Sequence, residues 1–92
     1  MAKRALGTGK TQNVAYTGTH GAISNAVNSQ FVRIWCSTDA FVVEGDSPTA
    51  TSSATPLAAK VAEYFIVTSP GTSKYSAIQQ ATGGTLYVTE CL

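Results

Sequence analysis

The sequence predicts an all-β fold, a small antiparallel β-sandwich or jelly-roll-like barrel of about six to eight short strands. Apolar residues alternate with polar ones in several short segments, which is typical of half-buried strands. Turn-forming residues separate these segments at intervals of about ten residues. No segment has a strong helical pattern. With 92 residues, the chain forms one domain.

We divide the chain into a flexible basic N-terminal arm, residues 1–12, and a single sandwich domain, residues 13–92. The arm is polar, and we expect it to be ordered only by a neighbouring molecule. Lys3, Arg4 and Lys10 all precede the first acidic residue of the chain. A basic segment of this kind is either a solvated tail or an arm that binds an acidic partner surface.

The central prediction is a β-hairpin formed by Phe31–Cys36 and Ala40–Glu44, which a Ser-Thr-Asp break separates. In the first strand, Val32, Ile34 and Cys36 share one face, and the residues between them share the other. Because the break has no glycine, a longer type I loop is favoured over a tight two-residue turn.

The remaining strands follow from the same alternation. In chain order we predict an edge strand at Asn13–Thr17, a strand at Ala22–Val27 with Ile23 in the core, and strands at Ala62–Thr68, Lys74–Gln80 and Thr85–Leu92. Ala62–Thr68 is apolar on both faces, which predicts a central position in a sheet. Ala81-Thr82-Gly83-Gly84 predicts a hairpin turn between the last two strands.

Two segments have weaker signals. Ser47–Thr55 is rich in hydroxyl groups and has no periodicity, so we predict an exposed loop. Pro56–Lys60 is consistent with a short helix, because Thr55 and Pro56 are typical of a helix start. A strand or an irregular crossing fits these residues equally well, since five residues cannot hold a helix alone.

Charged residues make up 12% of the chain, against about 25% in typical soluble domains, and the net charge is +1. This composition gives no electrostatic case for binding nucleic acid or a membrane. The chain has no apolar run as long as a membrane span and no signal peptide, so we expect synthesis in a host cytoplasm. Cys36 and Cys91 are then expected to be buried thiols, with a disulfide as the alternative.

The sequence offers no convincing catalytic group, metal site or cofactor site, and we expect a non-enzymatic protein. His20 is the only histidine and lies in a predicted turn, and the acidic residues are scattered singly. The segment Gly7–Thr11 ends like a phosphate-binding loop, but Arg4 stands where that motif requires a glycine.

Aromatic residues are the other candidates for function. Phe31, Trp35, Tyr64, Tyr75 and Tyr87 are placed so that they could share an outer face. Proteins that bind single-stranded nucleic acid use such faces together with many basic residues, which are few here. Burial in the core or a contact with another protein is the better interpretation.

From Val32 to Leu92 the chain resembles a group of small structural proteins encoded by tailed bacteriophages. The matching motifs are Gly45–Thr51, Glu63–Phe65, Pro70-Gly71, Ala77–Gln79 and Gly84–Glu90. Within that group, the size and composition favour a capsid cement (decoration) protein, located on the capsid exterior of the virion.

The resemblance implies binding across subunits of a major capsid protein, with further contacts between copies of the chain and with no cofactor, nucleic acid or membrane. A head–tail adaptor or tail component, and a free ligand-binding β-sandwich module, are the alternatives. The predicted interface residues are Lys3, Arg4, Lys10, Phe31, Arg33, Trp35, Pro48, Thr49 and Thr51.

Overall fold

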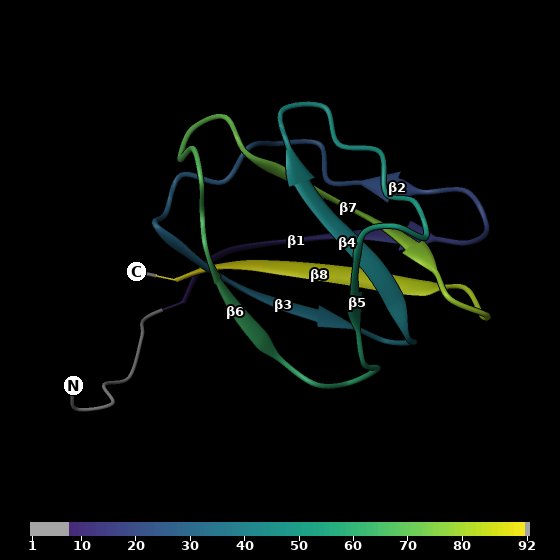
Figure 1. The fold of residues 1–92 in the computed structure, drawn as a ribbon. Coiled ribbons are helices and arrows are strands. Elements are labelled where there is room, and N and C mark those ends of the chain that lie inside the picture. Colours follow the sequence, from purple (N-terminus) through teal and green to yellow (C-terminus); the bar gives the residue numbers. More distant parts are fainter. Residues whose placement is uncertain (1–7, 92) are drawn as a thin grey trace.

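The computed structural model describes residues 8–91 as two four-stranded antiparallel sheets packed face to face (Figure 1). The predicted all-β sandwich is therefore confirmed. Sheet A has the strand order β1-β8-β3-β6, and sheet B has the order β2-β7-β4-β5. The strands are β1 (Thr8–Tyr16), β2 (Gly21–Ala22), β3 (Phe31–Cys36), β4 (Ala40–Gly45), β5 (Thr55–Leu57), β6 (Glu63–Ile66), β7 (Lys74–Gln79) and β8 (Gly84–Cys91).

The chain changes sheet at almost every connection. Only β4 and β5 are consecutive in sequence and paired in the same sheet. The predicted hairpin between β3 and β4 is therefore wrong, because these strands lie in opposite sheets. The hairpin predicted between β7 and β8 is wrong for the same reason. The strands themselves were placed within about one residue of their observed bounds, which is the accuracy expected at strand ends.

Alternation fixes which residues of a strand share a face, but not which sheet the strand joins. In β3 the residues Val32, Ile34 and Cys36 are buried, and in β4 the residues Ala40 and Val42 are buried. A short crossing between the sheets lets these two apolar faces meet across the core. A hairpin would have placed them side by side in one sheet, with the same sequence pattern.

The crossing from β3 to β4 lies against the crossing from β7 to β8. The Ser37 amide donates to the Thr85 carbonyl at 3.0 Å, and the Thr85 amide donates to the Ser37 hydroxyl at 2.8 Å. The Thr38 hydroxyl donates to the Thr82 carbonyl at 2.9 Å. Tyr16 joins this group, since its hydroxyl donates to the Thr38 carbonyl at 2.7 Å. These bonds satisfy polar groups that the crossings remove from water.

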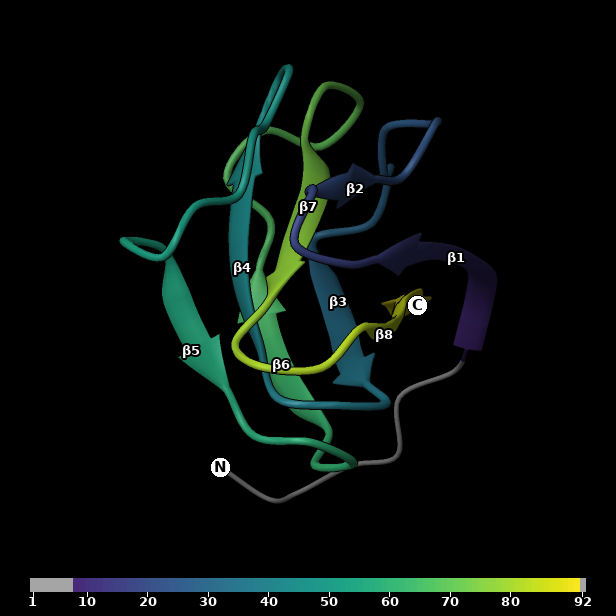
Figure 2. The ribbon, with the colours of Figure 1, turned by 90° about the vertical axis from the view of Figure 1, so that its right-hand side faces the viewer.

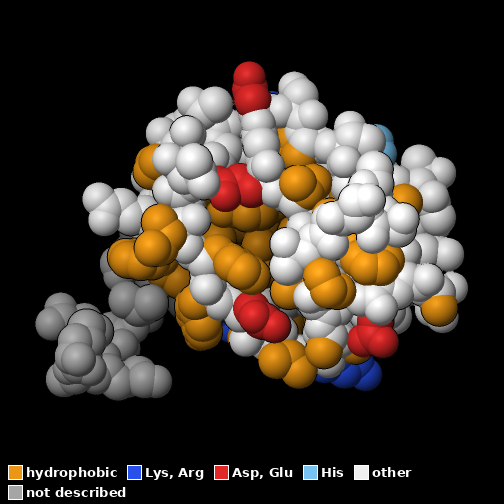
Figure 3. All heavy atoms as spheres, in the orientation of Figure 1, with side chains coloured by type: hydrophobic (Ala, Val, Ile, Leu, Met, Phe, Trp, Pro, Cys, Tyr) orange, Lys and Arg blue, Asp and Glu red, His pale blue; other side chains and the backbone are white. Residues whose placement is uncertain are grey.

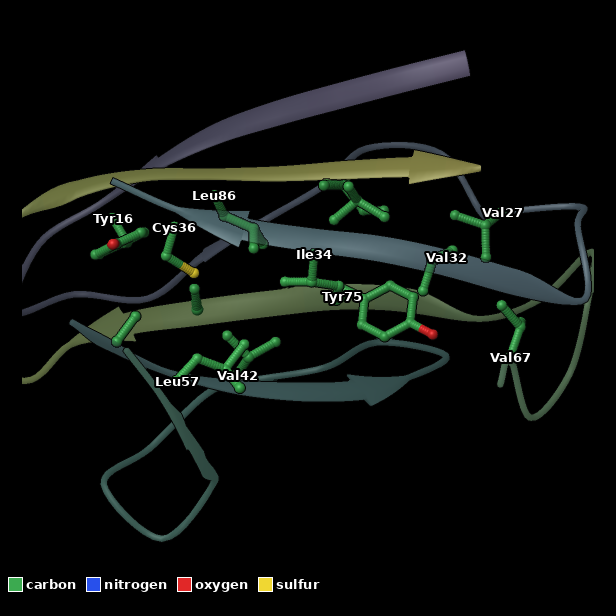
Figure 4. Packing of buried hydrophobic residues seen from close by; sticks show 14 residues of the cluster. Tyr16, Val27, Val32, Ile34, Cys36, Val42, Leu57, Val67, Tyr75 and Leu86 are labelled. Carbon is green, nitrogen blue, oxygen red and sulfur yellow. The ribbon is translucent and has the colours of Figure 1, made fainter. Parts of the chain in front are cut away.

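The core lies between the two sheets (Figure 4). Its largest fully buried side chains include Tyr16, Ile34 and Leu86. Tyr16 and Cys36 lie at one end of the core, and the Tyr75 hydroxyl points toward the opposite end, where Val67 lies (Figure 4).

Strand β6 is an edge strand, so its predicted central position is wrong. Its neighbour in the sheet is β3 alone. Tyr64 and Ile66 are 58% and 72% exposed, whereas Phe65 between them packs against the core. Two apolar faces thus arise from one face in the core and one exposed to solvent, rather than from burial on both sides.

The N-terminal part of the domain also differs from the prediction. β1 is an edge strand as predicted, but it begins at Thr8, so residues 8–12 belong to the sheet rather than to the arm. Lys3 and Arg4 lie outside the described residues. β2 spans only Gly21–Ala22, although Ile23 is buried as predicted and its amide still donates to the Tyr75 carbonyl of β7 at 3.0 Å.

The connections of β5 follow one of the alternatives left open by the sequence. Pro56 lies within strand β5, so the strand interpretation of Pro56–Lys60 holds for its first two residues. The predicted loop Ser47–Thr55 is the connection from β4 to β5, except that Thr55 already belongs to the strand. Ala50 in this loop is buried, and its amide donates to the Ser76 hydroxyl at 3.1 Å.

The two lateral sides of the sandwich differ. On one side β1 lies so close to β2 that a Cβ atom at Gly21 would overlap the Ala15 carbonyl oxygen. On the other side, where β5 and β6 form the sheet edges, a hollow opens toward the core. Figure 2 shows the same difference, with β1 beside β2 and β5 standing apart from β6.

Candidate functional site

The outer face of sheet A carries the largest group of exposed apolar residues. Phe31, Arg33 and Trp35 alternate with the buried residues of β3 and therefore point outward. In the register of the sheet, Phe31 lies opposite Ile66 and Arg33 lies opposite Tyr64, both on β6. The alternation along β3 thus places its three outward residues beside the two exposed residues of β6.

The same face continues over β8 and β1. Trp35 lies opposite Tyr87 of β8, and their rings meet edge to face at 5.5 Å between centroids and 67° between planes. Such a geometry is favourable for two aromatic rings. Tyr87 in turn lies opposite Asn13 of β1, where the face becomes polar. We call Phe31, Arg33, Trp35, Tyr64, Ile66 and Tyr87 the aromatic face.

The aromatic face is large enough to be functional. Phe31, Tyr64 and Tyr87 are 42%, 58% and 36% exposed. At ~150–250 Å² per aromatic side chain, these three alone expose roughly 200–350 Å². With Ile66 added, the patch reaches the range of about 300–600 Å² in which the largest surface patch of a monomer is often functional.

The aromatic face has little charge. Arg33 is the only charged residue that the described strands of sheet A direct to this side. Its guanidinium group lies near enough to Cys91 to oppose the rise that burial causes in the pKa of that thiol. A single arginine among aromatic residues is typical of the centre of a protein–protein interface.

The hollow at the open side of the sandwich is a second candidate. It has a volume of about 370 Å³, and Ile34, Val42, Leu57 and Phe65 contribute apolar walls. Figure 3 shows hydrophobic side chains within a hollow on the face of the molecule seen in Figure 1, with acidic side chains beside it. The hollow therefore exposes part of the core rather than a separate cavity.

Glu44 is the charged group of this hollow. Its carboxylate accepts the Thr68 amide at 2.8 Å and the Thr68 hydroxyl at 3.1 Å. It thereby links β4 of sheet B to the segment after β6 of sheet A. Since both carboxylate oxygens are engaged, we assign Glu44 a structural role at the open side.

Tyr75 lies opposite Glu44 in the register and also lines the hollow. Its hydroxyl is buried and has no hydrogen-bond partner among the described residues. Burial, and then the neighbouring Glu44 carboxylate, raise the pKa of this hydroxyl above its ordinary value. Tyr75 thus stays protonated at neutral pH. Its predicted place on an outer face is wrong, because β7 directs it into the core.

The two cysteines are both free and both buried. Burial raises the pKa of the Cys36 thiol from 9.0 to about 11, so it stays a thiol at neutral pH and is a poor nucleophile. Within residues 8–91 there is no group of three or more His, Cys, Asp and Glu side chains that could hold a metal ion.

The structure divides the predicted interface residues into separate groups. Phe31, Arg33 and Trp35 lie together on the aromatic face, and register adds Tyr64, Ile66 and Tyr87 to them. Lys10 is exposed on edge strand β1, beside a second hollow that Glu90 lines. Lys3 and Arg4 are outside the described range.

Pro48, Thr49 and Thr51 belong to the β4–β5 connection. This connection folds over the outer side of sheet B, because Ala50 packs against Ser76, which alternates with the inward-facing Tyr75 and Ala77. The loop residues and the aromatic face therefore lie on opposite outer faces of the sandwich. A single flat partner surface cannot contact both groups.

The sequence missed Ile66 as a surface residue of interest. Its exposure follows from the edge position of β6, which is a non-local property of the sheet. The only local signal is that Ile66 shares a strand face with Tyr64 rather than with Phe65.

Comparisons with protein-family models, with curated proteins and with solved structures find no match to this chain. The described part of the chain contains no helix long and apolar enough to cross a membrane.

Proposed function

We propose that this chain is a non-enzymatic structural protein of a tailed-phage virion, and specifically a capsid cement protein that binds across neighbouring major capsid subunits. The observation that carries the proposal is the aromatic face of sheet A, which exposes Phe31, Tyr64 and Ile66 around a single arginine. The sequence resemblance to small phage structural proteins gives the kind of partner.

A cement protein stabilises a shell by mass action. Each copy that buries surface against two capsid subunits lowers the free energy of the assembled shell and leaves dissociated subunits unaffected. This mechanism needs two contact surfaces on one small domain. The aromatic face and the β4–β5 connection, which holds Pro48, Thr49 and Thr51, supply surfaces on opposite sides.

The composition supports the same proposal. Only 12% of the residues are charged, so few charges would lose their hydration when the surface is covered. Threonine and serine hydroxyl groups provide hydrogen bonds to a partner at a lower cost of desolvation.

The experiment is a mass-spectrometric count of copies of the chain in purified phage particles. A cement protein is expected at a copy number comparable to that of the major capsid protein. A small fraction of that number would replace the proposal with a head–tail adaptor or a tail component. Absence of the chain from particles would contradict a virion role altogether.

One observation favours a different function, a free ligand-binding module. The hollow of about 370 Å³ beside Glu44 and Tyr75 has the size of a small-molecule site. This function predicts that the isolated chain binds a small molecule tightly and ignores phage capsids, which calorimetry with a metabolite mixture and with purified capsids separates.

A further inference from the structure

Exposed edge strands invite pairing with another chain, and proteins usually protect them. Three of the four sheet edges here are protected. β1 has a register irregularity between Thr8 and Thr11, and Lys10 lies within it. β5 contains Pro56, which has no amide hydrogen. β2 has only two residues and packs against β1.

Strand β6 has none of these protections. Its sequence Glu-Tyr-Phe-Ile contains no proline, no lysine and no glycine, and its pairing with β3 is regular. Its only charged residue is Glu63 at the first position. β6 is therefore an open, apolar edge on an otherwise protected sandwich.

The hydrogen-bonding pattern shows which backbone groups of β6 are free. The Val67 amide donates to the Gln30 carbonyl at 2.8 Å, so Val67 and Gln30 form a hydrogen-bonded pair. Such pairs alternate along an antiparallel ladder, so Phe65 and Glu63 also bond to β3. The amide and carbonyl groups of Tyr64 and Ile66 then point away from β3. Thr68 follows the same rule, since Glu44 accepts its amide.

We propose that β6 pairs antiparallel with β6 of a second copy of this chain about a two-fold axis. In this pairing Phe65 lies opposite Phe65 of the second copy, and Tyr64 lies opposite Ile66 in both directions. The free amide and carbonyl groups of Tyr64 and Ile66 then bond to each other across the axis. Sheet A becomes one eight-stranded sheet shared by two sandwiches.

The side chains support this register. On the outer side each Tyr64 packs beside an Ile66, which gives two aromatic–aliphatic pairs of the kind that stabilise antiparallel sheets. Glu63 lies opposite Val67 rather than opposite the other Glu63, so no like charges face each other. On the inner side the two Phe65 rings approach each other at the open side of the sandwich, where each already lines the hollow.

The contact is small and reversible. Tyr64 is 58% exposed, Ile66 is 72% exposed, and the adjoining Phe31 is 42% exposed. Covering these residues and the strand edge falls below the ~800 Å² per partner of a standard stable interface. The dimer is therefore concentration-dependent. Because the two-fold axis is perpendicular to sheet A, the pairing also joins two aromatic faces into one surface.

The test uses sedimentation of the purified full chain over a range of concentrations, with no capsid present. The mass is expected to rise from 9.5 kDa toward twice that value with concentration. Ile66→Lys places a charge on the edge of β6 and is expected to keep the single-chain mass throughout. Ala15→Lys adds the same charge to the outer side of edge strand β1 and is expected to behave as the wild type.

A second measurement tests the register. The pair Phe65–Phe65 is not hydrogen-bonded, so its Cα atoms lie about 4.5 Å apart and allow a disulfide. Phe65→Cys is expected to cross-link under mild oxidation, and Tyr64→Cys, offset from its own copy, is not. The native Cys36 and Cys91 are buried and do not compete.

A wild type that stays at the single-chain mass at every concentration overturns the proposal, as does equal dimerisation of Ile66→Lys. Equal cross-linking of both cysteine variants overturns the register. All of these outcomes are independent of whether the chain binds capsids, because they concern the isolated protein.

Discussion

At the scale of single residues, two buried tyrosines have opposite environments. The Tyr16 hydroxyl donates to the Thr38 carbonyl at 2.7 Å and accepts the Thr38 amide at 3.2 Å. The Tyr75 hydroxyl is also buried but has no partner within the described range. A buried polar group without a partner destabilises the folded state, whereas a satisfied one supports it.

Removing each hydroxyl is therefore expected to have opposite effects on stability. Tyr16→Phe leaves the Thr38 amide without its acceptor and is expected to lower the free energy of unfolding by about 1–3 kcal/mol. Tyr75→Phe removes the unsatisfied group and is expected to leave that free energy unchanged or to raise it. Urea unfolding of the two variants measures the difference. Equal losses in both would show that Tyr75 has an unseen partner.

Cys36 makes stability depend on alkaline pH. Burial raises the pKa of its thiol from 9.0 to about 11, so the folded protein retains this proton more strongly than the unfolded chain does. The resulting stabilisation is complete below about pH 9 and is lost as the pH rises through 11.

Comparison with Cys36→Ala isolates this contribution. The wild type is expected to be more stable below pH 9, and its advantage over the variant is expected to shrink between pH 9 and pH 11. Unfolding by urea at several pH values measures it. A constant difference would contradict the assigned shift in pKa, since the loss of the Cys36 side chain alone has no pH dependence.

At the scale of elements, the crossings between the sheets decide the topology. Their close packing requires Gly84, because a Cβ atom there would lie 2.8 Å from the Tyr16 hydroxyl and 2.7 Å from the Ser37 hydroxyl. It would lie closer still to the Thr38 hydroxyl. The glycine is needed for this approach and not for a hairpin turn, as its sequence context had suggested.

Gly84→Ala is accordingly expected to lower the free energy of unfolding by about 1–3 kcal/mol, as overpacking does. Gly18→Ala is the matched control, because the nearest atom to its Cβ would be the Gln79 side-chain nitrogen at 3.7 Å. That variant is expected to stay within about 0.5 kcal/mol of the wild type. Thermal unfolding compares the two, and similar losses would place the strain outside the crossings.

The same elements show what the sequence can predict. Alternation located β3, β4, β7 and β8 closely and assigned the inward faces of β3 and β8 correctly. It could not assign strands to sheets, because a short polar break serves equally as a hairpin turn or as a crossing. The position of β6 failed similarly, since an apolar residue on an edge and one in the core look alike in sequence.

The candidate site was predicted in the same partial way. Phe31, Arg33 and Trp35 were expected to share a face because they alternate within one strand, and the structure confirms that they do. Tyr64, Ile66 and Tyr87 join them through pairing between strands far apart in the chain. No local pattern contains that pairing.

At the scale of the whole molecule, the sandwich has one protected lateral side, one open side and two different outer faces. The outer side of sheet A is aromatic, and the outer side of sheet B is covered by the hydroxyl-rich β4–β5 connection. This arrangement suits a small domain that contacts different neighbours on opposite sides. The proposed pairing of β6 would add a third contact, with a second copy.

The most direct test measures binding of the chain to purified phage capsids that lack it. The wild type is expected to bind saturably, and Trp35→Ala is expected to weaken binding by about 2 kcal/mol or more, as loss of a central aromatic residue does. Phe41→Ala, on the outer side of sheet B, is the matched control and is expected to bind nearly as the wild type. Binding of Trp35→Ala at wild-type strength, or no binding by the wild type, would contradict the assignment of the aromatic face as a capsid-binding surface.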